Sequence, residues 1–364
     1  MTRPWIVPVG GFLGAGKTTL ILAAARVLTL RGIRCAAILN DQAGDLIDTE
    51  QAHRQGLAAN EVAGGCFCCR FSEMIDRIEE LRAAAPDVIF AEPVGSCTDL
   101  AATVLQPLQR EFGDRYRTAP LTVLVDPARA RELLTPERDP NFGFLFDQQI
   151  AEADIVVLTK LDLNLRAPEL PGVSPRFISA VTGEGVAAWL DDVLSGTRVG
   201  GAPLLDIDYE IYARAEAALG WLNWRGTIQL RDPLTPAEIA GRFVDSLGAA
   251  LTATGARIAH LKLLDSAESS YVKVSQTENG AEPRVEGDLT ASPAIHHELC
   301  VNLRAAMDAP LLDRLFRAEL AKQPGERREE SYECFSPARP EPERRFTGSP
   351  ESALSNTDIP PGMR

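Results

Sequence analysis

The first half of the chain alternates short apolar runs rich in Val and Ile with longer amphipathic stretches. This alternation predicts an α/β fold in which a mainly parallel sheet is wrapped by helices. Between residues 71 and 81, apolar residues recur at intervals of three and four, which predicts a helix with one buried face. We assign the whole α/β domain to residues 1–198. Its apolar runs are Trp5–Val9, Ile33–Leu39, Val88–Ala91, Leu121–Val125, Ile155–Leu158 and Arg176–Ile178.

A change of composition separates a second, smaller region. Between residues 195 and 203 the chain turns to Gly, Thr and Ala, which predicts a linker. We expect an α+β domain over residues 206–322, with helices on one face of its sheet. Residues 323–364 are rich in Pro, Glu and Arg, so we expect a flexible tail there. The predicted strands are 221–230, 258–264, 270–274 and 299–303, and the predicted helices are 236–253 and 310–320.

Composition narrows the class of protein. The 37 Lys and Arg residues against 51 Asp and Glu give a net charge of −14, which would repel a nucleic-acid backbone. The longest apolar stretch, Ile21–Leu30, is interrupted by Arg26, and the N-terminus has no apolar signal segment. We therefore expect a cytoplasmic protein that binds neither nucleic acid nor membrane. In that compartment the seven cysteines favour metal binding or catalysis over disulfides.

A phosphate-binding motif, G-x-x-x-x-G-K-[ST], lies between the first apolar run and a helical stretch. Its backbone N–H groups and the positive end of the helix would cradle phosphates. Lys17 would bridge the β- and γ-phosphates, and the Thr18 hydroxyl would ligate Mg²⁺. The alternative is a glycine-rich turn that carries a surface lysine. The candidate nucleotide-binding residues here are Gly11, Gly14, Ala15, Gly16, Lys17, Thr18 and Thr19.

Glu92 and Gly95 follow the run that ends at Ala91, at a position where open parallel sheets bind their ligands. Glu92 can hold Mg²⁺ through water or orient the attacking water, so we take it with Lys17 as a candidate catalytic residue. The alternative is that Glu92 only caps the next helix. Gly95 can let its amide approach the γ-phosphate and move when that phosphate leaves.

A candidate site for the base follows the run that ends at Leu158. Asp162 can accept two N–H bonds from a guanine edge while the stem of Lys160 packs over the ring. Ser179 and Ala180 could offer a backbone N–H to the base oxygen. Thr159 stands where Asn is usual and replaces only part of an amide. We therefore expect GTP as the substrate, and the strictness of GTP over ATP stays open.

Cys66, Cys68 and Cys69 form a C-x-C-C motif on a glycine-hinged loop just before the helix predicted from residue 71. Three thiols this close can bind one Zn²⁺, Co²⁺ or other thiophilic cation, and a helix N-terminus would lower their pKa. A fourth ligand would come from Asp41, Cys97, solvent or a thiol of a recipient. A redox disulfide or inert buried cysteines are the alternatives.

Taken together, the phosphate loop, the C-x-C-C block, the segment 92–95 and the segment 159–162 resemble the CobW family. These are metal-inserting or metal-trafficking P-loop GTPases of the SIMIBI class. The resemblance extends in part to Asn40–Ala43, which aligns with the family's Asn-Glu-Phe-Gly switch and makes Asp41 a candidate catalytic residue. Asp48 falls where the family has an acidic switch residue.

The resemblance implies a GTP-hydrolysing metallochaperone that uses GTP, Mg²⁺ and Zn²⁺ or Co²⁺ and serves a metalloprotein client. Partner recognition is the expected task of the second domain, and both a monomer and a homodimer stay open. One alternative is a P-loop ATPase that activates a corrinoid enzyme or another metalloenzyme. Another is a nucleotide-responsive zinc sensor without useful turnover.

Overall fold

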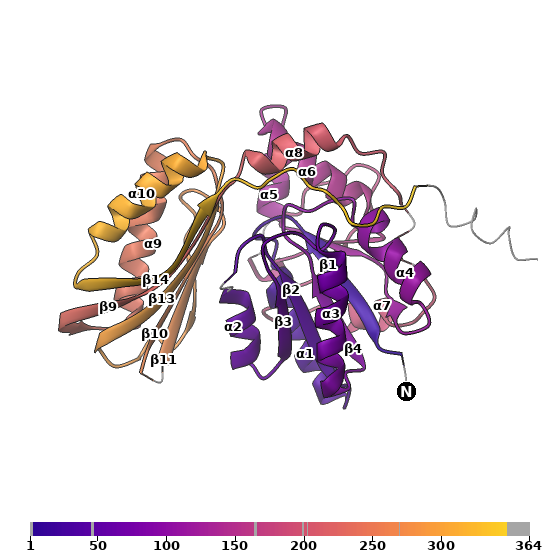
Figure 1. Ribbon diagram of the computed structural model, residues 1–364, viewed down its shortest axis with the longest axis horizontal. Helices are drawn as coiled ribbons and strands as arrows, with labels where there is room; N and C mark the ends of the chain where they lie inside the picture. Colours follow the sequence, from indigo (N-terminus) through magenta and orange to yellow (C-terminus); the bar gives the residue numbers. More distant parts are fainter. Residues whose placement is uncertain are drawn as a thin grey trace, which may run out of the picture.

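The computed structural model describes residues 3–44, 47–163, 166–198, 200–201, 203–268 and 270–347. Its first sheet has the order β3-β2-β4-β1-β6-β7-β8, and β5 also pairs with β1 (Figure 1). Each of these pairings is parallel, which confirms the predicted α/β fold. The strands are β1 (Trp5–Gly11), β2 (Cys35–Asn40), β3 (Ala58–Val62), β4 (Val88–Glu92), β5 (Arg117–Thr118), β6 (Thr122–Val125), β7 (Ile155–Leu158) and β8 (Arg176–Phe177).

Helices cover both faces of this sheet. On one face α1 (Lys17–Leu30) and α7 (Val186–Val193) pack on the strands through an apolar cluster that includes Leu20 and Trp189. On the other face α3 (Phe71–Leu81) buries the spaced apolar residues that predicted it, and its bounds match the prediction. The remaining helices on that face are α4 (Gln106–Phe112), α5 (Pro127–Leu133), α6 (Pro140–Ala151) and α8 (Tyr209–Ala217).

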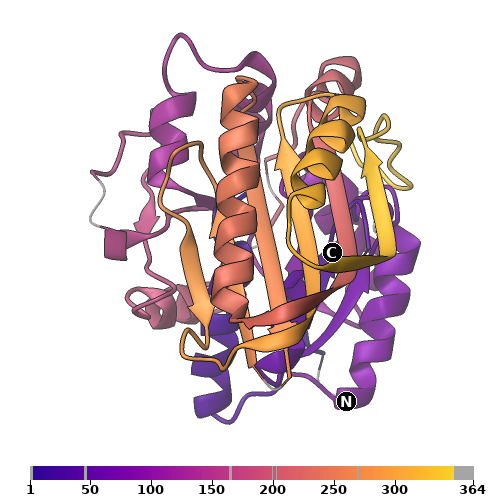
Figure 2. The same cartoon turned by 90° about the vertical axis from the view of Figure 1, so that its left-hand side faces the viewer.

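The second sheet is antiparallel, with the order β12-β11-β10-β13-β9-β14. Two helices, α9 (Pro236–Ala253) and α10 (Ala309–Ala321), cover its outer face, and the inner face is turned toward the first domain (Figures 1 and 2). This is the predicted smaller α+β domain. Its strands are β9 (Gly220–Leu234), β10 (Ile258–Ala267), β11 (Ser270–Gln276), β12 (Arg284–Gly287), β13 (Ala294–Ala305) and β14 (Glu326–Phe335).

The expectation of a flexible tail from residue 323 is wrong for the part that the structure describes. Glu326–Phe335 forms the edge strand β14, which pairs with β9 through its backbone although its side chains are mostly charged. Residues 336–347 then run back across the first domain, and we call this segment the strap (Figure 1). Residues 348–364 of the expected tail lie outside the described residues.

One helix of the first domain packs on strand β3 and also contacts the second domain. The helix α2 (Ile47–Arg54) lies against β10 and β13 of the second domain. Ile47 shares a small apolar cluster with Leu264 and Cys300 on those strands. The segment between β2 and α2 therefore joins the two domains. Among all described helices, none has the length and apolar character needed to cross a membrane.

Candidate functional site

The phosphate loop has the backbone that the motif predicts. Gly11, Gly14 and Gly16 have φ values of 129°, 80° and 95°, a region that other residues rarely adopt. A Cβ atom at Gly11 would lie 2.4 Å from the carbonyl oxygen of Leu124, so glycine is required there. Lys17 Nζ donates to the carbonyl oxygen of Gly11 at 3.0 Å. The lysine thus lies folded across its own loop, and burial lowers its pKa.

The predicted partners of this loop converge on it. Thr18 Oγ1 donates to Glu92 Oε1 at 3.1 Å, and Lys17 Nζ lies 3.9 Å from the same oxygen. Glu92 Oε2 is buried and has no hydrogen-bond partner among the described residues. Burial raises the pKa of Glu92 to about 7. Gly95 touches the loop directly, because a Cβ atom there would lie 3.0 Å from the backbone nitrogen of Leu13.

A hydroxyl beside a carboxylate oxygen without a partner is an oxygen donor set of the kind that Mg²⁺ prefers. Thr18 and Glu92 therefore fit the ion that the motif implies. The lysine stands next to them, as phosphate binding requires.

The candidate base site is assembled in part. Asp162 Oδ1 accepts a hydrogen bond from Ser179 Oγ at 2.6 Å, which brings the ends of β7 and β8 together, and Ala180 follows directly. The Thr159 hydroxyl donates to the carbonyl oxygen of Ala15 at 3.0 Å. That hydroxyl therefore fastens this loop to the phosphate loop.

Lys160 has a left-handed backbone with φ 59° and forms an ion pair with Asp126 at 2.5 Å. Sequence reasoning missed Asp126. Its position directly after the apolar run of β6 was the available signal, because polar residues at the carboxyl ends of parallel strands gather at one edge of the sheet.

The three motif cysteines meet in a tight cluster. All are free thiols, and their sulfur atoms lie within 4.8 Å of one another. Around a tetrahedral Zn²⁺ with Zn–S bonds of about 2.3 Å, neighbouring sulfurs stand about 3.8 Å apart. The backbone N–H groups of Cys69 and Arg70 both donate to the carbonyl oxygen of Cys66 at 3.0 Å, which forms the turn into α3. Cys66 Sγ lies 2.6 Å from Cys68 Sγ and 3.2 Å from Cys69 Sγ, and the latter two sulfurs are 3.7 Å apart. Cys66 would therefore have to move away from the other two sulfurs for all three to surround one cation.

The three thiols of this cluster differ in their pKa values. Hydrogen bonds from Cys68, Cys69 and Cys97 lower the pKa of the Cys66 thiol well below its usual range. Bonding to Cys66 raises the pKa of Cys68 and raises that of Cys69 to about 12. The lowered pKa expected for all three thiols is thus found for Cys66 alone among them, and its cause is hydrogen bonding from the other thiols. Since metal ligation requires thiolates, binding of a cation here must release protons.

Asn40 joins the sheet edge to the cysteine loop. Its Nδ2 donates to the carbonyl oxygens of Val62 and Gly65, and its Oδ1 accepts from the N–H of Phe67, all at 2.8 Å. Asn40 ends β2, the strand that pairs with β4, at whose end Glu92 lies. One buried side chain therefore connects the cysteine loop to the strand beside the candidate catalytic acid.

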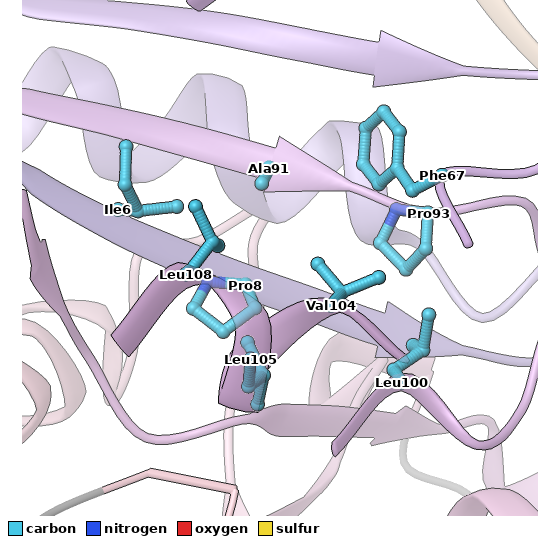
Figure 3. A pocket seen from close by; sticks show the side chains of 9 residues that line it. All are labelled: Ile6, Pro8, Phe67, Ala91, Pro93, Leu100, Val104, Leu105 and Leu108. Carbon is cyan, nitrogen blue, oxygen red and sulfur yellow. The ribbon is translucent and has the colours of Figure 1, made fainter. Parts of the chain in front are cut away.

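Phe67 provides a second connection. Its ring lies beside Pro93 on the wall of a small apolar cavity between the sheet and the helices of that face (Figure 3). Pro93 directly follows Glu92 in the chain. A shift of residues 92–95 would therefore displace the cysteine loop through packing as well as through Asn40.

Asp41 is engaged by the second domain. Its Oδ1 accepts hydrogen bonds from Arg304 Nη2 at 2.8 Å and from the N–H of Ala43 at 3.3 Å. Arg304 lies on β13 and is fully buried. Its local sequence gives no sign of this role, so sequence reasoning missed it.

The strap covers the cysteine loop. The backbone N–H of Glu341 donates to Cys69 Sγ at 3.2 Å, and that of Glu343 donates to the carbonyl oxygen of Cys68 at 2.9 Å. The Glu343 carboxylate accepts from the N–H and the hydroxyl of Ser72 in the first turn of α3. The segment expected to be a loose tail is therefore part of the surroundings of the thiols.

A phosphate loop between a parallel strand and its helix, with a lysine, a hydroxyl and an acid converging there, defines a P-loop nucleotide-binding protein. Residues 5–173 match the family model described as CobW/HypB/UreG, nucleotide-binding domain. The chain belongs to the CobW/HypB/UreG family.

Three relatives illustrate the similarity. The chain is 31% identical over 174 residues to the urease accessory protein UreG of Ureaplasma parvum, covering 45% of this chain and 74% of that protein. It is 32% identical over 183 residues to the zinc chaperone CobW of Pseudomonas aeruginosa, covering 42% and 48%. It is 28% identical over 168 residues to the zinc chaperone YjiA of Escherichia coli, covering 44% and 50%. The chain thus spans about half the length of the two zinc chaperones.

Proposed function

We propose that this chain hydrolyses GTP and uses the difference between GTP and GDP to bind a transition metal ion and deliver it to a client protein. The observation that carries the proposal is the three-bond connection that Asn40 makes between the edge of the first sheet and the cysteine loop. The relatives named as zinc chaperones support it. A metallochaperone needs such a connection, because metal must be held in one nucleotide state and released in the other.

At the nucleotide, residues of this chain would position the phosphates and neutralise their negative charge. Lys17 exchanges the Gly11 carbonyl oxygen for the β- and γ-phosphates, and the glycine loop supplies backbone N–H donors. Thr18 and Glu92 would hold Mg²⁺, which when bound offsets negative charge on the phosphoryl oxygens. Gly95 stands against the loop and is placed to respond when the γ-phosphate leaves.

At the base, Ser179 donates a hydrogen bond to Asp162 Oδ1, and this carboxylate would accept two N–H bonds from guanine. Thr159 contributes no free hydroxyl, since it is bound to the phosphate loop. We infer a preference for GTP that depends on the Asp162 carboxylate. A competition of GTP against ATP checks it, and equal displacement by ATP would favour the ATPase alternative.

The cargo is a thiophilic cation held by Cys66, Cys68 and Cys69, with Zn²⁺ supported by the names of the relatives. Opening the strap is the step that would expose the ion to a client. Hydrolysis would act on the loop through Asn40 and Phe67. The two nucleotide states must differ in metal affinity by about 1–3 kcal/mol for this control to be useful.

Two variants test the proposal from its two ends. Lys17→Ala should lose GTP hydrolysis while it still binds one Zn²⁺ per chain. The triple change of Cys66, Cys68 and Cys69 to Ser should lose Zn²⁺ while it still binds GTP. A Lys17→Ala protein that hydrolyses GTP like the wild type, or a triple variant with unchanged Zn²⁺ stoichiometry, would contradict the proposal.

A further inference from the structure

The second sheet forms one wall of the phosphate loop. A Cβ atom at Gly14 would lie 2.7 Å from Thr277 Cγ2 and 3.4 Å from the carbonyl oxygen of Ala259. Arg129, from the first domain, donates to the carbonyl oxygens of Ile258 and Thr277, the first of these at 2.9 Å. The start of β10 and the end of β11 are thus fastened directly beside the loop.

Two basic side chains lie on the inner face of β10. Leu261 and Leu263 belong to the apolar core under α9 and α10. Because side chains alternate along a strand, His260 and Lys262 are directed to the opposite face, toward the first domain. His260 is 6% exposed, and its Nε2 has no hydrogen-bond partner in the described part of the chain. Burial lowers the pKa of His260 well below its usual range, so this nitrogen belongs to a neutral ring.

Lys262 reaches across to α2 of the first domain. Its Nζ donates to Asp48 Oδ2 on α2, and this ion pair is largely buried. Lys262 also interacts electrostatically with Glu92 and with Lys17 of the phosphate loop. A lysine of the second domain therefore stands within the electrostatic field of the nucleotide site.

The charges around this point favour an anion. Lys17, Lys262 and Lys273 are all buried here, and the acids that interact with them are Asp41, Asp48, Glu92 and Glu286. Two of these acids also pair with arginines, Asp41 with Arg304 and Glu286 with Arg284. Cations packed together out of water repel one another unless an anion lies among them. A terminal phosphate is the anion that the adjacent loop is built to receive.

We propose that Lys262 binds the terminal phosphate of the nucleotide from the second domain and leaves Asp48 when it does so. This inference rests on the proposed function, since it assigns a further residue to the same nucleotide site. GDP lacks the terminal phosphate, and Lys262 then returns to Asp48. Because α2 begins seven residues after Asn40, the exchange at Asp48 carries the nucleotide state into the segment that holds the cysteine loop.

A structural ion pair and a phosphate ligand make different predictions for the two partners. If the pair only holds the domains together, Lys262→Met and Asp48→Asn should weaken nucleotide binding alike. If Lys262 is a phosphate ligand, removal of Asp48 frees it, and Asp48→Asn should strengthen binding of a triphosphate. The two variants should then act in opposite directions.

The test compares dissociation constants of a slowly hydrolysed GTP analogue and of GDP for the wild type, Lys262→Met, Lys262→Arg and Asp48→Asn. We expect Lys262→Met to weaken the analogue by about tenfold or more and to change GDP by about twofold at most. Lys262→Arg should keep the preference for the triphosphate, and Asp48→Asn should bind the analogue more tightly than the wild type does. Equal losses for both nucleotides in Lys262→Met, or weaker analogue binding in Asp48→Asn, would overturn the inference.

Asp48→Asn keeps the size and polarity of the side chain, so it decides the question even where Lys262→Met does not fold. Failure of the proposed function has a different signature. In that case Lys17→Ala binds both nucleotides like the wild type, whatever Lys262 does. A wild-type protein that binds neither nucleotide would remove both proposals together.

Discussion

Glu92 is the acid on which the nucleotide site converges. Its Oε1 accepts from Thr18, its Oε2 is buried without a partner among the described residues, and its pKa is about 7 against an ordinary value of 4.5. Since the pKa is higher in the folded chain than in the unfolded one, the contribution of Glu92 to stability is full at low pH. It is lost as the pH rises through 7.

Glu92→Gln, which stays neutral, should therefore unfold at higher urea than the wild type at pH 8.5 and at nearly the same urea at pH 5. The expected gain at pH 8.5 is roughly 3 kcal/mol, because the pKa of about 7 lies about 2.5 units above 4.5 and each unit corresponds to about 1.4 kcal/mol. The measurement uses protein free of nucleotide and Mg²⁺, with the exposed Glu184→Gln as control. A gain at pH 5 as large as that at pH 8.5 would show that charge is not the cause.

Asn40 allows a second prediction for a single residue. Asn40→Ala leaves the carbonyl oxygens of Val62 and Gly65 and the N–H of Phe67 without this partner. We expect a loss of about 1–3 kcal/mol in the free energy of unfolding. More specifically, Zn²⁺ affinity should no longer depend on the bound nucleotide.

Asn60→Ala is the matched control, because Asn60 also donates to a backbone oxygen, that of Arg77, but does so beside α3 and away from the cysteines. Urea denaturation and Zn²⁺ titration with each nucleotide check both variants. If Asn40→Ala keeps the full nucleotide dependence, the connection runs elsewhere.

At the scale of elements, the strap is where the structure departs most from expectation. Its N–H groups donate to Cys69 Sγ and to the carbonyl oxygen of Cys68. A chain that ends at Phe335 keeps β14 and loses the strap. Its thiols should react with a thiol reagent about tenfold faster. In the full chain the strap must open before the reagent reaches the thiols, and a segment of this kind opens at a modest cost in free energy.

A chain that ends at Thr347 retains the described strap and serves as the control. It should react like the full chain. Equal rates for the chains that end at Phe335 and Thr347 would show that the strap does not shield the cysteine loop.

The sequence predicts those elements whose side chains form a regular apolar pattern or a known motif. The apolar spacing of α3 predicted its bounds, and the bounds predicted for α9 are also correct. The phosphate loop was predicted from its glycine motif. The sequence did not predict β14, because this strand at the sheet edge consists mostly of charged residues. It is held by backbone hydrogen bonds to β9, and composition does not predict backbone pairing. Strand β3 was missed for a related reason, because Ala58–Val62 is short and carries Asn60 and Glu61.

The candidate site could likewise be predicted only in part. Residues at the ends of apolar strands, such as Glu92 and Asp162, are visible because strand order places them at one edge. Arg304 and Lys262 come from a distant sheet, and only the packing of the two domains brings them to Asp41 and Asp48. No local pattern marks such a contact.

At the scale of the whole molecule, the second domain is bonded to the first domain through polar side chains of its inner face. Asn223, Asn302 and Arg304 of its inner face all bind the segment that leads from β2 into α2. Both domains therefore hold this segment. Under the proposed function, a change at the phosphates would move this segment, the second domain or both.

The most direct test of the account is the Zn²⁺ affinity of the full chain, measured by competition with a chromophoric chelator. The measurement is made once with Mg²⁺ and a slowly hydrolysed GTP analogue and once with Mg²⁺ and GDP. The account predicts dissociation constants that differ by about 5- to 150-fold, and the same factor when the nucleotide is titrated with and without Zn²⁺. Identical Zn²⁺ affinities in the two nucleotide states would contradict it.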